Sequence, residues 1–229
     1  MNTEAILYAL IGGILPALVW LFFWLREDRK NPEPRGLILR TFIFGMLAVF
    51  LVLPFQSAAY ELIPAVTLST FVLWSLIEEV FKLFAGYFGG IRTKEDNEPI
   101  DPIIYMITAA LGFTALENAL FLFEPILENG FLNGVMTLNL RFMGATLLHT
   151  LASGIVGLGF ALSFYKSQAT KVWYVLTSLV LAIVFHTGFN LLIVNENDSL
   201  AVLAFGLVWV GIVAILVLFE KVKRLRART

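Results

Sequence analysis

Ionisable side chains lie within long apolar stretches of this sequence, and a structural role alone explains them poorly. Glu78, Glu79 and Lys82 all fall in one apolar run that extends from about residue 64 to residue 91. A charged side chain costs roughly 2.5–3.5 kcal/mol at the bilayer centre, so such residues usually mark a functional site. Two adjacent buried carboxylates also resist ionising together, which suits them to proton transfer. The run therefore predicts an acid–base site buried between helices.

Three further apolar stretches contribute polar residues of the same kind. Glu117 lies in the first, His149 in the second, and His186 with Asn190 in the third. His149 and His186 are the only histidines of the chain. A single intramembrane histidine or asparagine often serves as a hydrogen bond between helices. Such groups in four consecutive apolar stretches are better explained by a shared functional site.

Helical spacing places several of these groups on common faces. Residues four apart in a helix are neighbours on its surface. Three such pairs occur: Glu78 with Lys82, His149 with Ser153, and His186 with Asn190. We expect Lys82 to compensate part of the charge of Glu78. We expect Asn190 to orient the ring of His186 or, together with His186, to stabilise a developing oxyanion.

The composition predicts an all-α, polytopic transmembrane helix bundle. Of 229 residues, 59% are hydrophobic and only 14% are charged, whereas soluble domains have about 25% charged residues. The absence of cysteine excludes thiol catalysis, disulfides and thiolate metal ligands. About seven spans are expected, and the fifth stretch should begin as an interfacial segment with Arg141. The expected spans are residues 5–25, 37–55, 64–91, 103–123, 135–165, 172–194 and 200–219.

The distribution of basic residues predicts the orientation of the bundle. With seven spans, 14 of the 16 Lys and Arg residues lie in or beside loops on one side. Because positive charges mark the cytoplasmic side, we expect the N-terminus outside and the C-terminus in the cytoplasm. We expect residues 1–229 to form a single integral membrane domain, with the catalytic helices at about 65–194. Residues 220–229 are then a basic cytoplasmic tail.

Four motifs carry a resemblance to a known family. In order along residues 73–192, they are EExxK at Glu78-Glu79-Val-Phe-Lys82, FxxxE at Phe113-Thr-Ala-Leu-Glu117, His149 with Ser153 four residues later, and HxxxN at His186-Thr-Gly-Phe-Asn190. The chain thereby resembles the PrsW family of intramembrane proteases, relatives of the CAAX prenyl-protease and Abi superfamily. In the wider superfamily the second motif ends in histidine, whereas Glu117 occupies that place here, as is usual for the PrsW branch.

The resemblance implies a glutamic-type intramembrane endopeptidase in a bacterial or archaeal cell membrane. The catalytic set that it implies is Glu78, Glu79, Glu117, His149, His186 and Asn190, with Lys82 and Ser153 in support. The substrate would be a single-pass membrane protein, such as an anti-sigma factor cleaved at site 1. No cofactor is required, but a zinc form stays open, with Glu117, His149 and His186 as ligands. The bilayer is an expected partner and nucleic acid is not.

Other functions use similar groups. Intramembrane carboxylates and histidines also occur in proton-coupled transporters and receptors, although transporters often show internal repeats and none is visible here. An enzyme that processes acyl chains or lipids is a further alternative. The sequence decides neither which glutamate is the base nor the oligomeric state.

Overall fold

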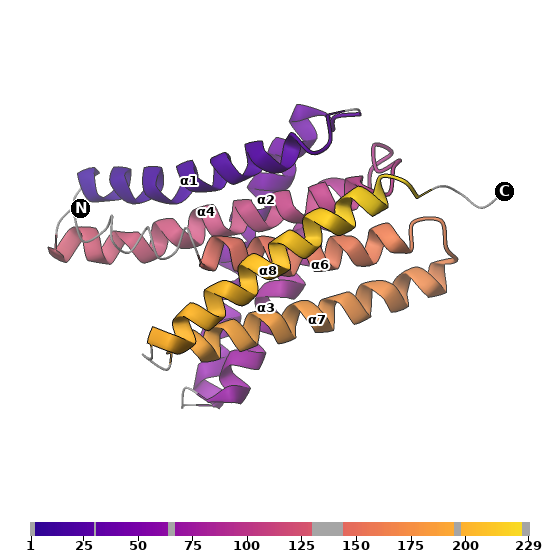
Figure 1. Ribbon diagram of the computed structural model, residues 1–229. Coiled ribbons are helices and arrows are strands. Elements are labelled where there is room, and N and C mark those ends of the chain that lie inside the picture. The colour runs from indigo at the N-terminus through magenta and orange to yellow at the C-terminus, as the bar shows by residue number, and fades with distance from the viewer. Residues whose placement is uncertain (1–2, 30, 64–66, 130–143, 195–197, 226–229) are drawn as a thin grey trace.

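The computed structural model describes residues 3–29, 31–63, 67–129, 144–194 and 198–225, and it is a bundle of long helices (Figure 1). No strand occurs in these described ranges, which confirms the all-α class. The elements are α1 (Thr3–Leu25), α2 (Arg35–Leu62), α3 (Leu68–Gly86), the π-helix η1 (Tyr87–Ile91), α4 (Asp101–Asn129), α6 (Ala145–Leu162), α7 (Gln168–Val194) and α8 (Asp198–Val222).

Six of these helices are long and apolar enough to cross a membrane. The other two are η1, which has only five residues, and α3, in which Glu78, Glu79 and Lys82 make three of the 19 residues charged. The helical path continues from α3 through η1 to Ile91, so the whole segment covers nearly the same residues as the predicted third span. The chain is therefore a multi-pass membrane protein whose most polar helix lies among apolar ones.

Two helices run past their predicted ends. The second span was expected to end at residue 55, but α2 continues to Leu62 and includes Gln56. The fourth was expected at residues 103–123, but α4 extends from Asp101 to Asn129. Polar residues mark where a helix leaves the apolar layer, and a helix does not need to end there. The predicted interfacial segment with Arg141 lies outside the described residues.

The core of the bundle is formed by α4 and α6. In the most apolar 18-residue stretch of each of these two helices, 78% of the residues are buried, compared with 22% in α1 and 28% in α8. Small residues allow α4 to approach its neighbours closely. A Cβ atom on Gly45 of α2 would lie 2.0 Å from the carbonyl oxygen of Ala109, and one on Gly112 of α4 would lie 2.0 Å from that of Phe42. Backbone contact between α2 and α4 thus depends on both glycines.

The helix ends divide the bundle into two sides. In Figure 1 the start of α1 and the end of α8 lie at opposite ends of the bundle. The helices α3, α6 and α7 each contact a neighbour that carries part of the predicted polar set. Polar residues from separate apolar stretches can therefore meet inside the bundle.

Candidate active site

The polar face of α3 is buried against the other helices. Glu79 and Lys82 are 0% exposed and Glu78 is 7% exposed. Lys82 Nζ donates a hydrogen bond to Glu79 Oε1 at 2.6 Å and lies 4.0 Å from Glu78 Oε2. Lys82 therefore forms the expected ion pair with Glu78, but its closer partner is Glu79. The flexible lysine stem also reaches the residue three positions back, and it forms the shorter contact there.

His186 of α7 is oriented by the second glutamate. Its Nδ1 lies 2.7 Å from Glu79 Oε1, and its Nε2 lies 3.7 Å from Glu78 Oε2. Because Glu79 Oε1 accepts the Nδ1 proton, Nε2 is left with a lone pair that faces Glu78. This pattern resembles the outer partners that orient histidines at catalytic and metal sites.

His149 of α6 lies between a lysine and a third glutamate. Lys82 Nζ is 2.7 Å from His149 Nδ1, and Glu117 Oε2 is 3.2 Å from Nε2. The ammonium group donates to Nδ1, so the imidazole proton belongs on Nε2 and points at Glu117. The ring of Phe113 packs near both groups, with its centroid 5.1 Å from Lys82 Nζ and 5.6 Å from the centroid of the histidine ring. Lys82 thus links Glu79 to His149.

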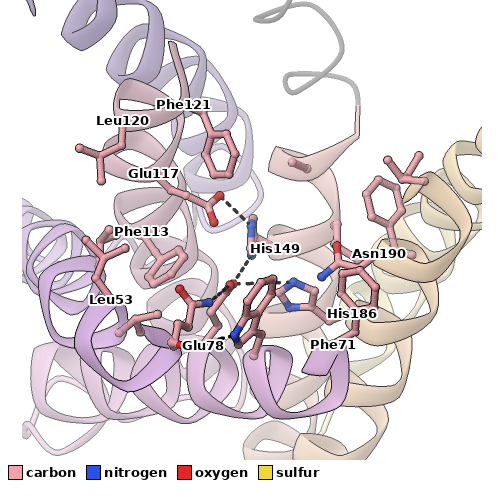
Figure 2. Close-up of a pocket in the computed structure, with 18 of the residues that line it drawn as sticks. Leu53, Phe71, Glu78, Phe113, Glu117, Leu120, Phe121, His149, His186 and Asn190 are labelled. Atoms are coloured by element: carbon pink, nitrogen blue, oxygen red, sulfur yellow. Dashed lines mark hydrogen bonds and ion pairs between the residues drawn. The ribbon is translucent and has the colours of Figure 1, made fainter. Parts of the chain in front are cut away.

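A cavity of about 720 Å³ brings most of the predicted site residues together. Figure 2 shows their side chains converging from α3, α4, α6 and α7. The predicted residues that line the cavity are Glu78, Glu117, His149, His186 and Asn190. Glu79, Lys82 and Ser153 are not among the lining residues. The buried Ser153 Oγ has no hydrogen-bond partner within the described part of the chain, so no hydrogen bond connects it to the site.

Gln56 also belongs to the site, and the sequence analysis missed it. Its Nε2 donates a hydrogen bond to Glu78 Oε1 at 2.9 Å, and its backbone carbonyl accepts one from Trp74 Nε1 at 3.3 Å. Both Gln56 and Trp74 line the cavity. The signal in the sequence was weak, because Gln56 follows the predicted end of the second span by one residue. A lone polar residue there suggested only the membrane boundary.

The side chains around Glu78 could also hold a metal ion. One ligand atom each from Glu78, His149 and His186 lie within 4.8 Å of one another. The predicted zinc set had Glu117 in place of Glu78, whereas Glu117 here contacts the Nε2 nitrogen of His149. Two neutral imidazoles and a carboxylate are a typical catalytic zinc donor set. The buried Glu78 Oε2, which has no hydrogen-bond partner in the described structure, also fits such an ion.

Fold and cavity together define a class of protein. A bundle of membrane-spanning helices surrounds carboxylates and histidines in hydrogen-bond contact beside a cavity, which is an arrangement for proton transfer within the membrane. The family model described as PrsW family intramembrane metalloprotease matches residues 33–219. The chain therefore belongs to the PrsW family of intramembrane proteases.

Similar bacterial proteins named Protease PrsW cover most of this chain. The one from Geobacillus kaustophilus is 30% identical over 194 residues, which are 83% of this chain and 82% of that protein. The one from Halalkalibacterium halodurans is 30% identical over 209 residues, or 89% and 93% of the two chains. The one from Bacillus subtilis is 24% identical over 193 residues, or 82% and 84%. No solved structure matches the chain significantly.

Proposed function

We propose that this intramembrane protease is of the glutamic type, with Glu78 as the general base. The observation that carries the proposal is the position of Glu78. It lines the cavity, Gln56 holds its Oε1, and its Oε2 has no hydrogen-bond partner in the described structure. Glu79 does not line the cavity, and its Oε1 already contacts both Lys82 and His186. Glu78 is therefore the better placed of the two to take a proton from water.

The proposed reaction is hydrolysis by a water molecule held beside Glu78. Glu78 takes one proton from the water, and the resulting hydroxide adds to the scissile carbonyl carbon. The proton then passes to the amide nitrogen, the C–N bond breaks, and a carboxyl and an amine product leave. A positioned base typically contributes about 10²–10⁴-fold to the rate. That transfer to nitrogen regenerates the free carboxylate of Glu78, and the carboxyl product then loses its own proton to solvent.

The remaining groups position the reactants. Asn190 lines the cavity and could donate its amide N–H to the oxyanion, a contact worth roughly 10²–10³-fold. His186 Nε2 carries a lone pair in the tautomer that Glu79 selects, so it accepts a hydrogen bond from the water. His149 and Glu117 form a second proton-carrying pair at 3.2 Å, near the expected place of the leaving amine.

The family description also implies a metal form. Glu78, His149 and His186 would hold the ion, which would activate the water and polarise the carbonyl. In the structure Lys82 Nζ donates to His149 Nδ1, so binding of an ion at that nitrogen requires this hydrogen bond to be given up. Zinc content of the purified protein distinguishes the two forms. The glutamic form keeps full activity after dialysis against a zinc chelator, and the metal form loses it.

The proposed substrate is a single-pass membrane protein, such as an anti-sigma factor cut at site 1. Apolar residues on the walls of the cavity, including Leu53, Leu120 and Phe121, suit the side chains of a membrane-anchored segment. The cavity is lined by the end of α4 at Glu124 and the end of α7 at Val194. With the orientation predicted from the basic residues, these ends face the outside, so cleavage would release an extracellular domain.

The test compares released ectodomains from cells that contain wild type or Glu78→Gln at matched levels. Mass spectrometry of the outer medium identifies new peptide termini. We expect fragments with wild type and a loss of about 10²-fold or more with the variant. Glu128→Gln is the matched control, because Glu128 is an exposed carboxylate on α4 outside the cavity. Unchanged release in a correctly inserted Glu78→Gln variant would contradict the role of Glu78.

A further inference from the structure

Three carboxylates from separate segments meet at the end of the bundle opposite to the active-site cavity. Asp28 follows α1, Glu33 precedes α2, and Asp101 is the first residue of α4. Each offers one oxygen atom, and these oxygens lie within 4.8 Å of one another. Asp28 is 5% exposed and Asp101 is 1% exposed. We call these three residues the acidic cluster.

One oxygen of the acidic cluster has no partner. Asp28 Oδ2 is buried and makes no hydrogen bond within the described structure. Buried polar atoms normally have a partner, so an exception needs an explanation such as an ion. Among the described residues, no lysine or arginine forms an ion pair with the three carboxylates. The nearby Lys223 instead contacts Glu27 and Glu220 at 3.2 and 2.6 Å.

Hydrogen bonds satisfy other oxygens of the acidic cluster without neutralising it. Asp101 Oδ2 accepts the backbone N–H groups of Asn97 and Glu98 at 2.8 and 2.7 Å. The hydroxyl of Tyr105 donates to Glu33 Oε2. The N-terminus of α4 adds only about half a positive charge. When all three carboxyl groups are ionised, three negative charges lie close together, and a cation would relieve their repulsion.

We propose that Asp28, Glu33 and Asp101 bind one hard divalent cation, Mg²⁺ or Ca²⁺. Both ions prefer oxygen ligands and complete their coordination with water. A cavity of about 450 Å³, lined by Glu33, Asp101, Asn31 and Glu98 among others, adjoins the carboxylates and leaves room for such waters. The cation would connect the loop between α1 and α2 to the start of α4. The proposal does not depend on the protease mechanism.

Isothermal titration calorimetry with MgCl₂ or CaCl₂, on purified full-length protein freed of metal by chelator, tests this site. We expect one cation per chain, and Asp28→Asn and Glu33→Gln each to weaken binding about tenfold or more, since each removes one ligand charge. Glu27→Gln is the matched control, because it removes the neighbouring carboxylate, which pairs with Lys223 outside the acidic cluster. Glu78→Gln removes the active-site carboxylate and should leave binding unchanged.

Melting temperatures provide the second measurement. A cation at about 100 times its Kd should raise the melting temperature of wild type by roughly 5 °C or more. At the same cation concentration the rise should be about half as large or smaller in Asp28→Asn and in Glu33→Gln, while both variants stay folded in chelator. Absence of binding by wild type, or equal binding by the variants, overturns the proposal. Stability that depends on pH and is insensitive to both cations also overturns it, because the acidic cluster would then hold protons instead.

Discussion

The protein has two buried groups of carboxylates, and they are neutralised in different ways. In the active site, Lys82 Nζ lies 2.6 Å from Glu79 and 2.7 Å from His149, so a positive charge is built into the fold. In the acidic cluster of Asp28, Glu33 and Asp101, no lysine or arginine of the described structure forms an ion pair with the carboxylates, and the nearby Lys223 pairs with Glu27 and Glu220. Charge in the active site is thus held by the protein, whereas charge in the acidic cluster depends on what the solution provides.

Helix α4 connects the two groups. Asp101 begins the helix and Glu117 follows 16 residues later, a separation of roughly 24 Å along the axis. The same buried helix therefore carries a carboxylate into the catalytic cavity at one place and into the acidic cluster at the other. Substitutions that remove a charge should have opposite consequences at the two places, and this difference can be measured.

The largest effect is expected from Lys82→Met. It removes the cation that Glu79 and His149 share, and it leaves a carboxylate that is 0% exposed without its ion pair. Breaking one side of a buried ion pair costs about 3–5 kcal/mol. We expect a large fall in melting temperature and loss of proteolysis.

Two further variants sharpen the result for Lys82. Lys166→Met is the control, because Lys166 is exposed and its loss should change stability little. The double variant Lys82→Met, Glu79→Gln should regain part of the lost stability, since it removes the unpaired carboxylate as well. Additive losses in the double variant would show that the lysine does not stabilise Glu79.

A smaller effect is expected from Gln56→Leu. Its side-chain hydrogen bond of 2.9 Å holds Glu78 Oε1, and a hydrogen bond to a charged group contributes about 1.5–3 kcal/mol. We expect kcat to fall about 10- to 100-fold with KM nearly unchanged, because Gln56 positions the base and does not need to touch the substrate. Gln168→Leu, which changes the other glutamine at an exposed position, is the control. A change in KM alone would instead indicate substrate binding by Gln56.

The sequence predicted which residues meet in the active site better than how they meet. Glu78, Glu117, His149, His186 and Asn190 line one cavity, as their places in consecutive apolar spans suggested. The positions of Glu78, Glu79 and Lys82 along α3 could not predict which glutamate pairs with Lys82, because a lysine side chain reaches residues three and four positions before it. That choice depends on the rotamer and on where His149 lies, which only the packing of α6 against α3 decides.

The acidic cluster could not be predicted for a different reason. Its three residues, Asp28, Glu33 and Asp101, lie in or beside polar loops. Charged residues are common in such loops and do not by themselves indicate a site. Their burial results from the way the loop between α1 and α2 packs against the start of α4. The basic residues did predict that these loops share one side of the membrane, but not that particular carboxylates meet. Gln56 was not predicted as a site residue for a similar reason, because one polar residue at the expected end of a membrane span carries little information.

Asp28→Asn should show the opposite sign to Lys82→Met. In chelator at pH 8, the substitution removes one of three crowded negative charges, and Asp28 Oδ2 gives up no hydrogen bond within the described structure. We expect the free energy of unfolding to be unchanged or to rise by up to about 1 kcal/mol, roughly the repulsion between two unit charges 4 Å apart in water. A fall as large as that of Lys82→Met would show that the acidic cluster already contains its own compensating charge.

The smallest effect is the contribution of the acidic cluster to the dependence of stability on pH. Burial and the neighbouring Asp101 raise the pKa of Asp28 from 3.8 to about 7, and burial raises the pKa of Glu33 from 4.5 to about 8 against the hydrogen bond from Tyr105. Because the folded state binds these protons more tightly than the unfolded chain, stability in chelator should fall as pH rises from about 5 to 8.

Melting temperatures across that range, in wild type and in the double variant Asp28→Asn, Glu33→Gln, measure this slope. We expect a flatter slope in the variant. Added Mg²⁺ or Ca²⁺ should raise the melting temperature of wild type most at the highest pH, where the carboxylates are ionised. A wild-type slope of the opposite sign would mean that these carboxylates are already neutralised within the fold, as Glu79 is by Lys82.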